Sequence, residues 1–337
     1  MDDKTKSCLY DICVRRNDLV IVDVMNNLHR FLWKNSELSV TIGDEIICTG
    51  HLYGMLRLTL TLRDRFKDCS IVLALDGYDK ERRQINTEYK ANRERRDDIY
   101  SLIPDLVKMC GLVDGVFFCY HKDFEADDVI NSVARTVRNL CKSKDLSKNI
   151  WVLSNDKDMY QLVRDDMMVP IKIIRKFGTG SNWMSDAEIV DENKVRESFN
   201  GVNPENLVKF RAIIGDSSDN LKGYFRFRKS NASIIAENYD YDLDSKTLNL
   251  KPGHTEYLEW GKFLDKIRED MSIFDKNYRI MKMKYFDFEM REQDFTDKSV
   301  LYDTIDLSKK YEMNSYLQRL MSGSYSRYRN QIMRYLV

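Results

Sequence analysis

The sequence predicts an α/β fold in which a central, mainly parallel β-sheet is flanked by helices. Short apolar runs, typical of buried parallel strands, alternate along the chain with helical patterns. Acidic residues stand at the ends of several runs, and active groups of open α/β sheets collect at the carboxyl ends of strands. We therefore expect a functional site at one edge of the sheet.

Each expected strand is a short run rich in Val, Ile, Leu or Phe, and each expected helix has apolar residues at helical spacing. The last third of the sequence carries fewer motifs and indicates a largely helical part. The strands are expected at residues 19–25, 70–75, 117–120 and 149–153 and near 279–287, and the helices at 26–34, 44–66, 126–141, 204–214, 254–272 and 305–321.

The composition is that of an intracellular, water-soluble chain. Lys and Arg together equal Asp and Glu at 54 each, so net charge alone names no partner. No apolar stretch approaches a membrane span, and the N-terminal residues are too polar for a secretory signal. The seven cysteines are scattered and lack CxxC spacing, which is typical of reduced thiols. We expect a cytoplasmic monomer without a membrane partner.

Nine carboxylates stand at the ends of expected elements. So many like charges tolerate one another in one place only when divalent cations lie among them. A set of carboxylates without His or Cys suits Mg²⁺, which assists phosphodiester hydrolysis. Taken singly, each cluster also fits ordinary helix-capping or turn acids, and the pair Asp216 and Asp219 fits a capped turn better than a metal site, so the inference rests on their joint order. The nine residues are Asp23, Asp76, Glu125, Asp127, Asp128, Asp156, Asp158, Asp216 and Asp219.

If these nine acids bind metal, nine basic residues are left in excess on the rest of the molecule, which suits a polyanion. Residues 78–98 are almost all charged and have no apolar face. This segment fits a solvated helix or mobile loop and equally a basic element above the metal cluster.

The series of motifs resembles the 5′-nuclease (flap endonuclease) superfamily, and within it the bacteriophage 5′→3′ exonucleases, including the ribonuclease H of the T-even phages. Each motif is weak alone, whereas their order and spacing together are specific. They span residues 19–232 and comprise Asp23, Asp76-Gly77, Tyr89-Lys90-Ala91-Asn92-Arg93, Glu125-Ala126-Asp127-Asp128, Ser154-Asn155-Asp156-Lys157-Asp158 and Gly215-Asp216-Ser217-Ser218-Asp219-Asn220.

The resemblance implies a PIN-like 5′-nuclease fold with a helical arch at about residues 78–110. The nuclease core would cover residues 1–200. A helical C-terminal domain, residues 201–337, would contain a modified helix-turn-helix-like DNA-binding element at about 204–238.

The resemblance also implies two Mg²⁺ ions, for which Mn²⁺ would substitute, and it counts Asp127 and Asp156 among the catalytic residues. The ligands of the first ion would be Asp23, Asp76, Glu125, Asp127 and Asp128, and those of the second Asp156, Asp158, Asp216 and Asp219.

By the same resemblance, Lys90 and Arg93 would act in catalysis by contacting the reacting phosphate from one face of a helix. Tyr89 would stack on a base, with Arg82 and Arg83 in support.

Many family members continue with a glycine-rich hairpin whose backbone amides grip duplex phosphates. Here Arg226 and Arg228 occupy the hairpin-glycine positions, and non-glycine residues resist positive φ. We expect Lys222, Arg226, Arg228 and Lys229 to pair with phosphates through their side chains instead. A surface loop without DNA contact is the alternative.

The function that follows from the resemblance is Mg²⁺-dependent 5′→3′ exonuclease and flap endonuclease action on DNA and RNA–DNA hybrids, removing RNA primers and flaps in phage replication. Expected substrates are 5′ flaps and forked or nicked duplexes, and a single-strand-binding protein or sliding clamp is a candidate partner. The alternatives are a PIN-type RNA endonuclease and a non-catalytic DNA-binding module.

Overall fold

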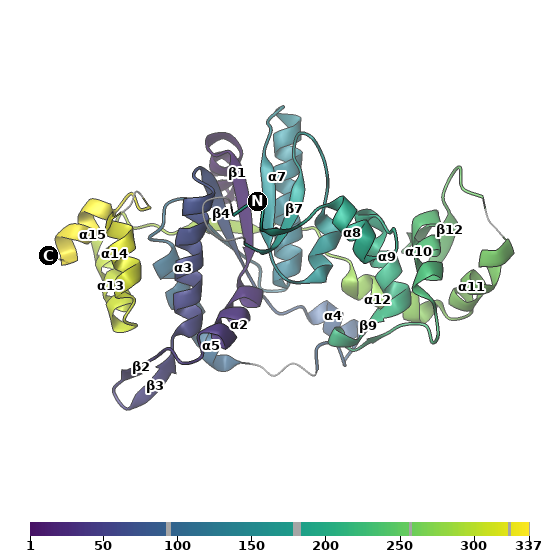
Figure 1. Ribbon diagram of the computed structural model, residues 1–337, viewed down its shortest axis with the longest axis horizontal. Helices are drawn as coiled ribbons and strands as arrows, with labels where there is room; N and C mark the ends of the chain where they lie inside the picture. The colour runs from purple at the N-terminus through teal and green to yellow at the C-terminus, as the bar shows by residue number, and fades with distance from the viewer. Residues whose placement is uncertain (92–95, 178–182, 256–257, 323–324, 337) are drawn as a thin grey trace. The chain divides into compact units, whose positions relative to one another are not determined.

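The computed structural model describes residues 1–91, 96–177, 183–255, 258–322 and 325–336 (Figure 1). The chain divides into two compact units. The first unit comprises Met1–Gly77, Arg95–Ser154 and Phe286–Val337, and the second comprises Tyr78–Glu94 and Asn155–Tyr285.

The strands of the first unit that belong to the main sheet follow the order β13-β5-β4-β1-β6. The neighbours β5 (Val116–Tyr120), β4 (Cys69–Leu75), β1 (Asp18–Asp23) and β6 (Asn149–Leu153) are all parallel, as the apolar runs predict. Residues Leu19–Val22 of β1 are fully buried, because parallel strands are covered on both faces. The predicted α/β class with a mainly parallel sheet is confirmed.

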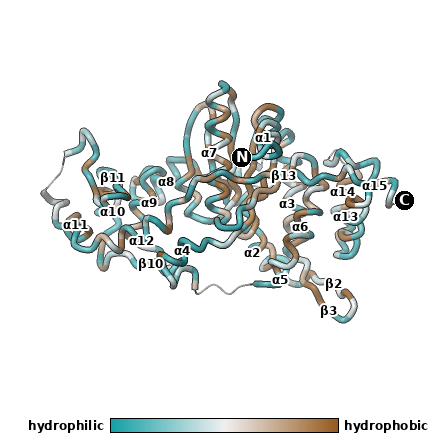
Figure 2. The backbone as a smooth tube through the Cα atoms, turned by 180° about the vertical axis from the view of Figure 1, so that it is seen from behind, coloured by the Kyte–Doolittle hydropathy of each residue, from teal (hydrophilic) through white to brown (hydrophobic). Residues whose placement is uncertain are grey.

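Helices cover both sides of these strands. In Figure 1, α7 (Ala126–Ser143) lies on one side of β1 and β4, and α3 (Gly50–Arg65) lies on the other. The buried face of α7 carries Val129, Val133 and Val137 at helical spacing. Figure 2 shows the most hydrophobic chain segments gathered along the central strands of this unit. The sheet edge that carries the acids therefore rests on a rigid, packed core.

The remaining elements of the first unit surround this core. They are α1 (Asp3–Tyr10), the π-helical turn η1 (Asp11–Arg15), α2 (Val24–Lys34), β2 (Ser39–Ile42), β3 (Glu45–Cys48), α5 (Asp97–Ser101), α6 (Ile103–Cys110), β13 (Glu289–Glu292), α13 (Lys298–Lys310), α14 (Asn314–Ser322) and α15 (Arg329–Leu336).

Three sequence predictions in this unit are wrong, and one of them is the single helix expected at 305–321, where the structure has the two helices α13 and α14. The expected helix 44–66 begins only at Gly50, because residues 39–48 form the antiparallel hairpin β2–β3 around Gly43, whose φ is +63°. The strand expected near 279–287 lies at Glu289–Glu292, because residues up to 281 belong to helix α12 (Met271–Met281) of the second unit.

The two compact units divide the chain differently from the expected domains, whose boundary near residue 200 stays a prediction. Strand β13 pairs antiparallel with β5, which returns the C-terminal segment to the first unit. Helix α4 (Lys80–Ile85) belongs to the second unit, whereas α5 and α6 belong to the first, so the segment expected to form the arch is shared between the units.

The second unit is largely helical and includes a second core cluster. Tyr89, Val208, Leu221, Ile280 and Met281 pack together there. Its elements are α4, η2 (Lys157–Leu162), β7 (Ile171–Lys176), β8 (Glu188–Val190), α8 (Glu192–Ser198), η3 (Pro204–Asn206), α9 (Leu207–Ile214), β9 (Gly215–Asp216), η4 (Ser217–Asp219), β10 (Leu221–Lys222), α10 (Lys229–Asn238), β11 (Tyr239–Asp242), β12 (Thr247–Leu250), α11 (Leu258–Glu269) and α12 (Met271–Met281).

Among the described residues, no helix combines the length and the apolar character that crossing a bilayer requires. The seven cysteines are free thiols.

Candidate metal centre

Asp23 ends strand β1 and also caps helix α2. One of its carboxylate oxygens accepts a hydrogen bond from the backbone N–H of Asn26 at 3.1 Å, and the other accepts one from the Ser154 hydroxyl at 2.8 Å. The side-chain amide of Asn27 donates to the carbonyls of Asp23 and Leu153, at 2.8 and 3.2 Å. Only 5% of Asp23 is exposed. Its carboxylate nevertheless accepts hydrogen bonds from the first turn of helix α2 and from Ser154, which directly follows β6.

Asp76 follows strand β4 and is tied to the start of helix α7. Its Oδ1 accepts the backbone N–H of Ala126 at 2.7 Å. The next residue, Gly77, donates its N–H to the Phe124 carbonyl at 2.9 Å. A Cβ at position 77 would lie 2.0 Å from the carbonyl oxygen of His121, so only glycine allows this approach. The Asp-Gly pair therefore joins a strand end to a helix N-terminus.

The acidic segment at that helix N-terminus contributes three more carboxylates. Glu125 is the N-cap residue of α7, and Asp127 and Asp128 lie in its first turn. Asp128 is completely buried and Glu125 nearly so. The macrodipole of α7 favours negative charge here, which accounts for part of this arrangement. The contact between Asp76 and Ala126 brings a fourth acid to the same helix end.

In the second unit, Asp158, Asp216 and Asp219 form a compact cluster. One carboxylate oxygen from each lies within 4.8 Å of the others. The Asp156 side chain accepts the Asp158 amide at 2.9 Å and caps the turn η2. Acid-only oxygen donors this close fit a hard divalent cation. Three of the four acids that the resemblance assigns to the second metal ion thus lie close together in this unit, and their role as metal ligands stays a prediction.

Arg211 of helix α9 inserts its guanidinium among these acids and forms ion pairs with both Asp158 and Asp216. Burial raises the pKa of Asp216, but hydrogen bonds from Ser218 and the charge of Arg211 outweigh burial and hold this pKa below its ordinary value. A cation thus already lies beside the cluster. Sequence reasoning did not single out Arg211, which precedes the Gly-Asp motif by four residues.

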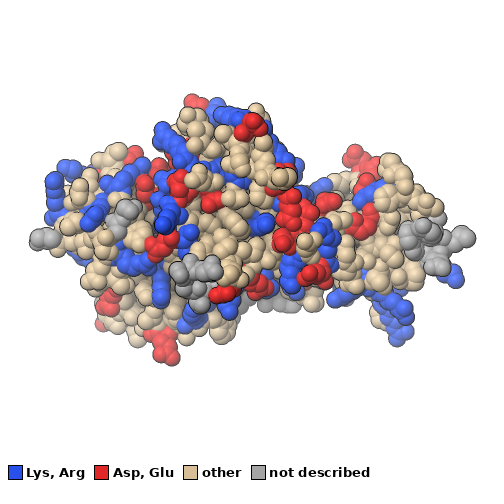
Figure 3. All heavy atoms as spheres, turned by 45° about the horizontal axis from the view of Figure 1, so that its top comes forward, with Lys and Arg blue, Asp and Glu red and all other residues tan. Residues whose placement is uncertain are grey.

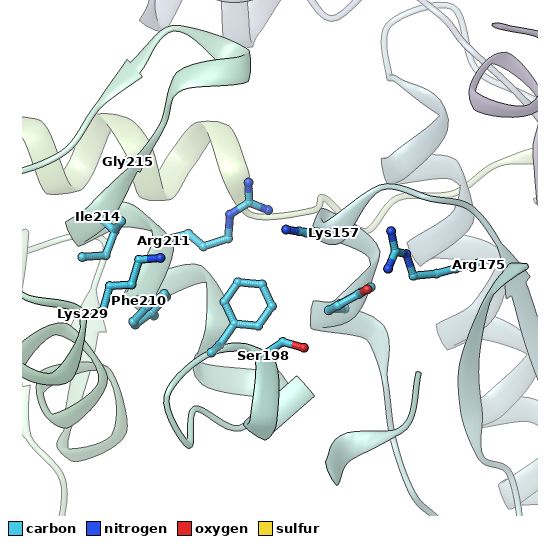
Figure 4. A pocket seen from close by; sticks show the side chains of 10 residues that line it. Lys157, Arg175, Ser198, Phe210, Arg211, Ile214, Gly215 and Lys229 are labelled. Carbon is cyan, nitrogen blue, oxygen red and sulfur yellow. The ribbon is translucent and has the colours of Figure 1, made fainter. Parts of the chain in front are cut away.

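A cavity of about 310 Å³ lies next to Arg211 (Figure 4). Figure 4 shows the ends of the Arg211 and Lys157 side chains facing one another among the residues that line the cavity. Phe199 and Phe210 form apolar parts of its wall, and the remaining lining residues are Tyr160, Arg175, Ser198, Ile214, Gly215 and Lys229. The cavity is thus basic where it approaches the acids.

Several predicted nucleic-acid contacts occupy positions that differ from expectation. Arg82 is 2% exposed; its guanidinium donates to the Ile280 carbonyl at 2.9 Å and pairs with Asp79. Tyr89 is 3% exposed within the second core cluster. These buried positions do not fit direct contact of either side chain with a nucleic acid.

Lys90 has a φ of +55°, so the expectation that it shares a helical face with Arg93 is wrong at Lys90. Its Nζ lies 4.9 Å from the centre of the Tyr89 ring. The guanidinium of Arg83 stacks over Tyr78 at 4.8 Å. Arg93 lies outside the described residues.

The segment that corresponds to the glycine-rich hairpin contains a residue with left-handed backbone conformation, although arginines stand at the glycine positions. Arg226 has a φ of +54°, and Lys222, Arg228 and Lys229 are exposed with it. Gly223 approaches the Ile214 carbonyl so closely that a Cβ would lie 1.9 Å from its oxygen. Arg226 thus adopts a positive φ that a non-glycine residue resists.

On the face that Figure 3 shows, basic and acidic side chains are interspersed, in agreement with the equal numbers of the two. Local geometry, rather than overall charge, therefore distinguishes the acidic clusters. The convergence of all nine carboxylates on one place stays a prediction.

Comparisons with known proteins agree with the motifs. Residues 18–200 match the family model described as 5′-3′ exonuclease, N-terminal resolvase-like domain. The chain is 27% identical over 213 residues to a 5′-3′ exonuclease of Buchnera aphidicola, covering 62% of this chain and 66% of that protein. It is 28% identical over 244 residues to the 5′-3′ exonuclease of Bacillus subtilis, covering 71% and 76%.

A DNA polymerase I of Pseudomonas aeruginosa is 32% identical over 214 residues, which are 61% of this chain and only 20% of that longer protein. The matched region is thus a part of a larger molecule in that relative.

Two solved structures share the fold. One is the phage T5 5′-exonuclease with bound zinc ions, with a TM-score of 0.53 and 18% identity, covering 90% of this chain and 99% of that one. The other is the bacteriophage T5 flap endonuclease in a pseudo-enzyme-product complex with DNA and metal ions, with a TM-score of 0.53 and 16% identity, covering 90% and 98%. Since the family model matches more than half of the residues, the chain belongs to the 5′-3′ exonuclease family of the 5′-nuclease superfamily.

Proposed function

We propose that the protein is a metal-dependent 5′→3′ exonuclease and flap endonuclease that hydrolyses phosphodiester bonds of DNA and of RNA in RNA–DNA hybrids. The observation that carries the proposal is the cluster of Asp158, Asp216 and Asp219, whose oxygens lie within 4.8 Å of one another in a chain of the 5′-3′ exonuclease family. Metal ions and DNA in the related phage structures support it.

The proposed cofactors are two Mg²⁺ ions, replaceable by Mn²⁺. When bound, such ions supply Lewis-acid stabilisation of the charge that develops on the phosphate and its leaving oxygen. The proposed ligands of one ion are Asp23, Asp76, Glu125, Asp127 and Asp128, and those of the other are Asp156, Asp158, Asp216 and Asp219.

A hydroxyl and two backbone amides of the chain itself orient the proposed ligands. Ser154 and the Asn26 amide orient the Asp23 carboxylate, and the Ala126 amide orients Asp76. Donors held in this way reduce the reorganisation needed when charge develops. Lys90 and Arg93 are proposed to add positive charge beside the reacting phosphate.

The proposed biological task is removal of RNA primers and 5′ flaps during phage replication, on flapped, forked or nicked duplexes. Products would carry 5′-phosphate and 3′-hydroxyl ends. The likeness to the T-even ribonuclease H, recruitment by a single-strand-binding protein or sliding clamp, a monomeric state and a cytoplasmic location in the host belong to the same proposal.

The test is digestion of a 5′-labelled flap substrate by the full chain, with and without Mg²⁺. We expect short products from the 5′ end that require the metal. Asp156→Asn should abolish cleavage and leave duplex binding largely intact, whereas Asp244→Asn, which changes an exposed acid in the β11–β12 turn, should cleave normally.

Internal cuts in free RNA would instead indicate a PIN-type RNA endonuclease. Binding of the flap substrate without any cleavage would indicate a non-catalytic DNA-binding module. Near-normal turnover by Asp156→Asn would refute the assignment of the site.

A further inference from the structure

The turn between β10 and α10 exposes one aromatic ring while its neighbours are held in place. The Phe225 side chain is 74% exposed. The preceding Tyr224 is buried, and its hydroxyl donates to the Asp270 carbonyl at 2.6 Å. Phe227 packs against Phe263 with a centroid distance of 5.8 Å. Phe225 is therefore displayed by a turn that is anchored on both sides of it.

Backbone contacts fix the same turn. The Tyr224 amide donates to the Ile213 carbonyl at 2.9 Å, and Lys266 Nζ donates to the carbonyl of Phe225 at 2.6 Å. Arg226 adopts a φ of +54°, which an L-residue occupies at a cost of roughly 1 kcal/mol or more. Burial of the neighbouring Phe225 ring does not offset the strain at Arg226, because the ring is exposed. A strained residue kept beside an exposed apolar ring points to a binding role.

The charges around Phe225 identify the kind of partner. The guanidinium carbon of Arg226 lies 4.9 Å from the centre of the Phe225 ring. Lys222, Arg228 and Lys229 are exposed on the same short segment. A flat apolar ring beside several cations matches a polyanion that also offers flat bases, which is a nucleic acid.

We propose that Phe225 stacks on the free face of a nucleobase at a strand end, nick or gap in DNA bound by this turn, and that Arg226 pairs with a neighbouring phosphate. The stacking proposal rests on the proposed function in one respect, which is that the bound DNA is the substrate of the nuclease. A base inside a continuous duplex has both faces covered and must be unstacked first. The contact therefore favours interrupted over continuous duplexes.

The test uses full-length protein without divalent ions, so that binding is measured apart from cleavage. DNA carries 2-aminopurine at the base that borders a gap, and affinity is measured by anisotropy alongside 2-aminopurine fluorescence. Wild-type protein should quench the fluorescence. Phe225→Ala should lose the quenching and bind gapped DNA about tenfold more weakly, with its affinity for continuous duplex unchanged.

Phe225→Trp should retain both signals, whereas Phe225→Leu, which keeps the apolar bulk but not the ring, should lose the quenching. Tyr285→Ala, which removes a ring that is 51% exposed elsewhere in the same unit, should behave as wild type. Circular dichroism confirms that each variant is folded.

Wild-type quenching and affinity in Phe225→Ala would overturn the proposal, as would equal weakening on gapped and continuous DNA. Quenching by a wild-type protein that never cleaves would refute the nuclease function and leave the stacking contact intact. A wild-type protein that cleaves but does not quench the fluorescence would refute the stacking contact and leave the nuclease function intact.

Discussion

Gly77→Ala should be the most damaging single-methyl change at the acidic edge of the sheet. The added Cβ would lie 2.0 Å from the His121 carbonyl oxygen and 2.6 Å from that of Phe124, so the backbone must move by about 1.4 Å or more to restore ordinary contact. Such overpacking costs about 1–3 kcal/mol. The movement also disturbs the hydrogen bonds from Gly77 to Phe124, at 2.9 Å, and from Ala126 to Asp76, at 2.7 Å, each worth about 1 kcal/mol net.

We therefore expect the free energy of unfolding of the first unit to fall by about 3 kcal/mol. Urea unfolding of the full chain measures the loss, and hydrogen exchange of the Ala126 amide locates it, since that amide loses protection when Asp76 moves. Mn²⁺ affinity should fall as well.

Gly43→Ala is the matched control in the same unit. Its Cβ meets nothing within 4 Å, but its φ is +63°, so it should lose only about 1 kcal/mol and leave exchange at Ala126 unchanged. Equal stability losses in the two variants, or wild-type protection of Ala126 in Gly77→Ala, would refute the close-contact reasoning.

Three further predictions follow from other contacts. Burial lowers the pKa of His51 from 6.5 to about 4, so the folded state binds a proton less readily than the unfolded state. The free energy of unfolding should therefore decline as pH falls from 6.5 towards 4, by about 3 kcal/mol in all. Urea midpoints measured at several pH values should show this decline in wild type but not in His51→Leu, and parallel curves for the two proteins would contradict the prediction. Arg211→Gln removes the cation between the carboxylates of Asp158 and Asp216 and should lower the Tm measured without metal. Mn²⁺ should raise the Tm of this variant more than that of wild type, whereas Arg268→Gln, at an exposed ion pair, should behave as wild type. A Tm of Arg211→Gln that Mn²⁺ does not raise would count against a metal site at these carboxylates. Asn27→Ala removes a buried side-chain donor from the carbonyls of Asp23 and Leu153 and should lower the free energy of unfolding in urea by about 2 kcal/mol, whereas a loss below about 0.5 kcal/mol would contradict this.

Local patterns in the sequence were sufficient to predict the parallel strands and the acids that follow them. An apolar run carries its own evidence of burial, and a residue at its end stays at the end of the strand wherever the strand lies in the sheet. The positions of Asp23 after β1 and of Asp76 after β4 were predictable for this reason. So was the grouping of Asp216 with Asp219, which are three residues apart.

Only tertiary structure decided which charged and aromatic residues are buried. Arg82 and Tyr89 lie in a segment that is nearly all charged, yet residues from distant parts of the second unit cover both side chains. Arg211 pairs with Asp158, 53 positions earlier in the chain, and no local spacing indicates that contact. Burial and ion pairing depend on what packs against a side chain, and residues remote in sequence supply those neighbours.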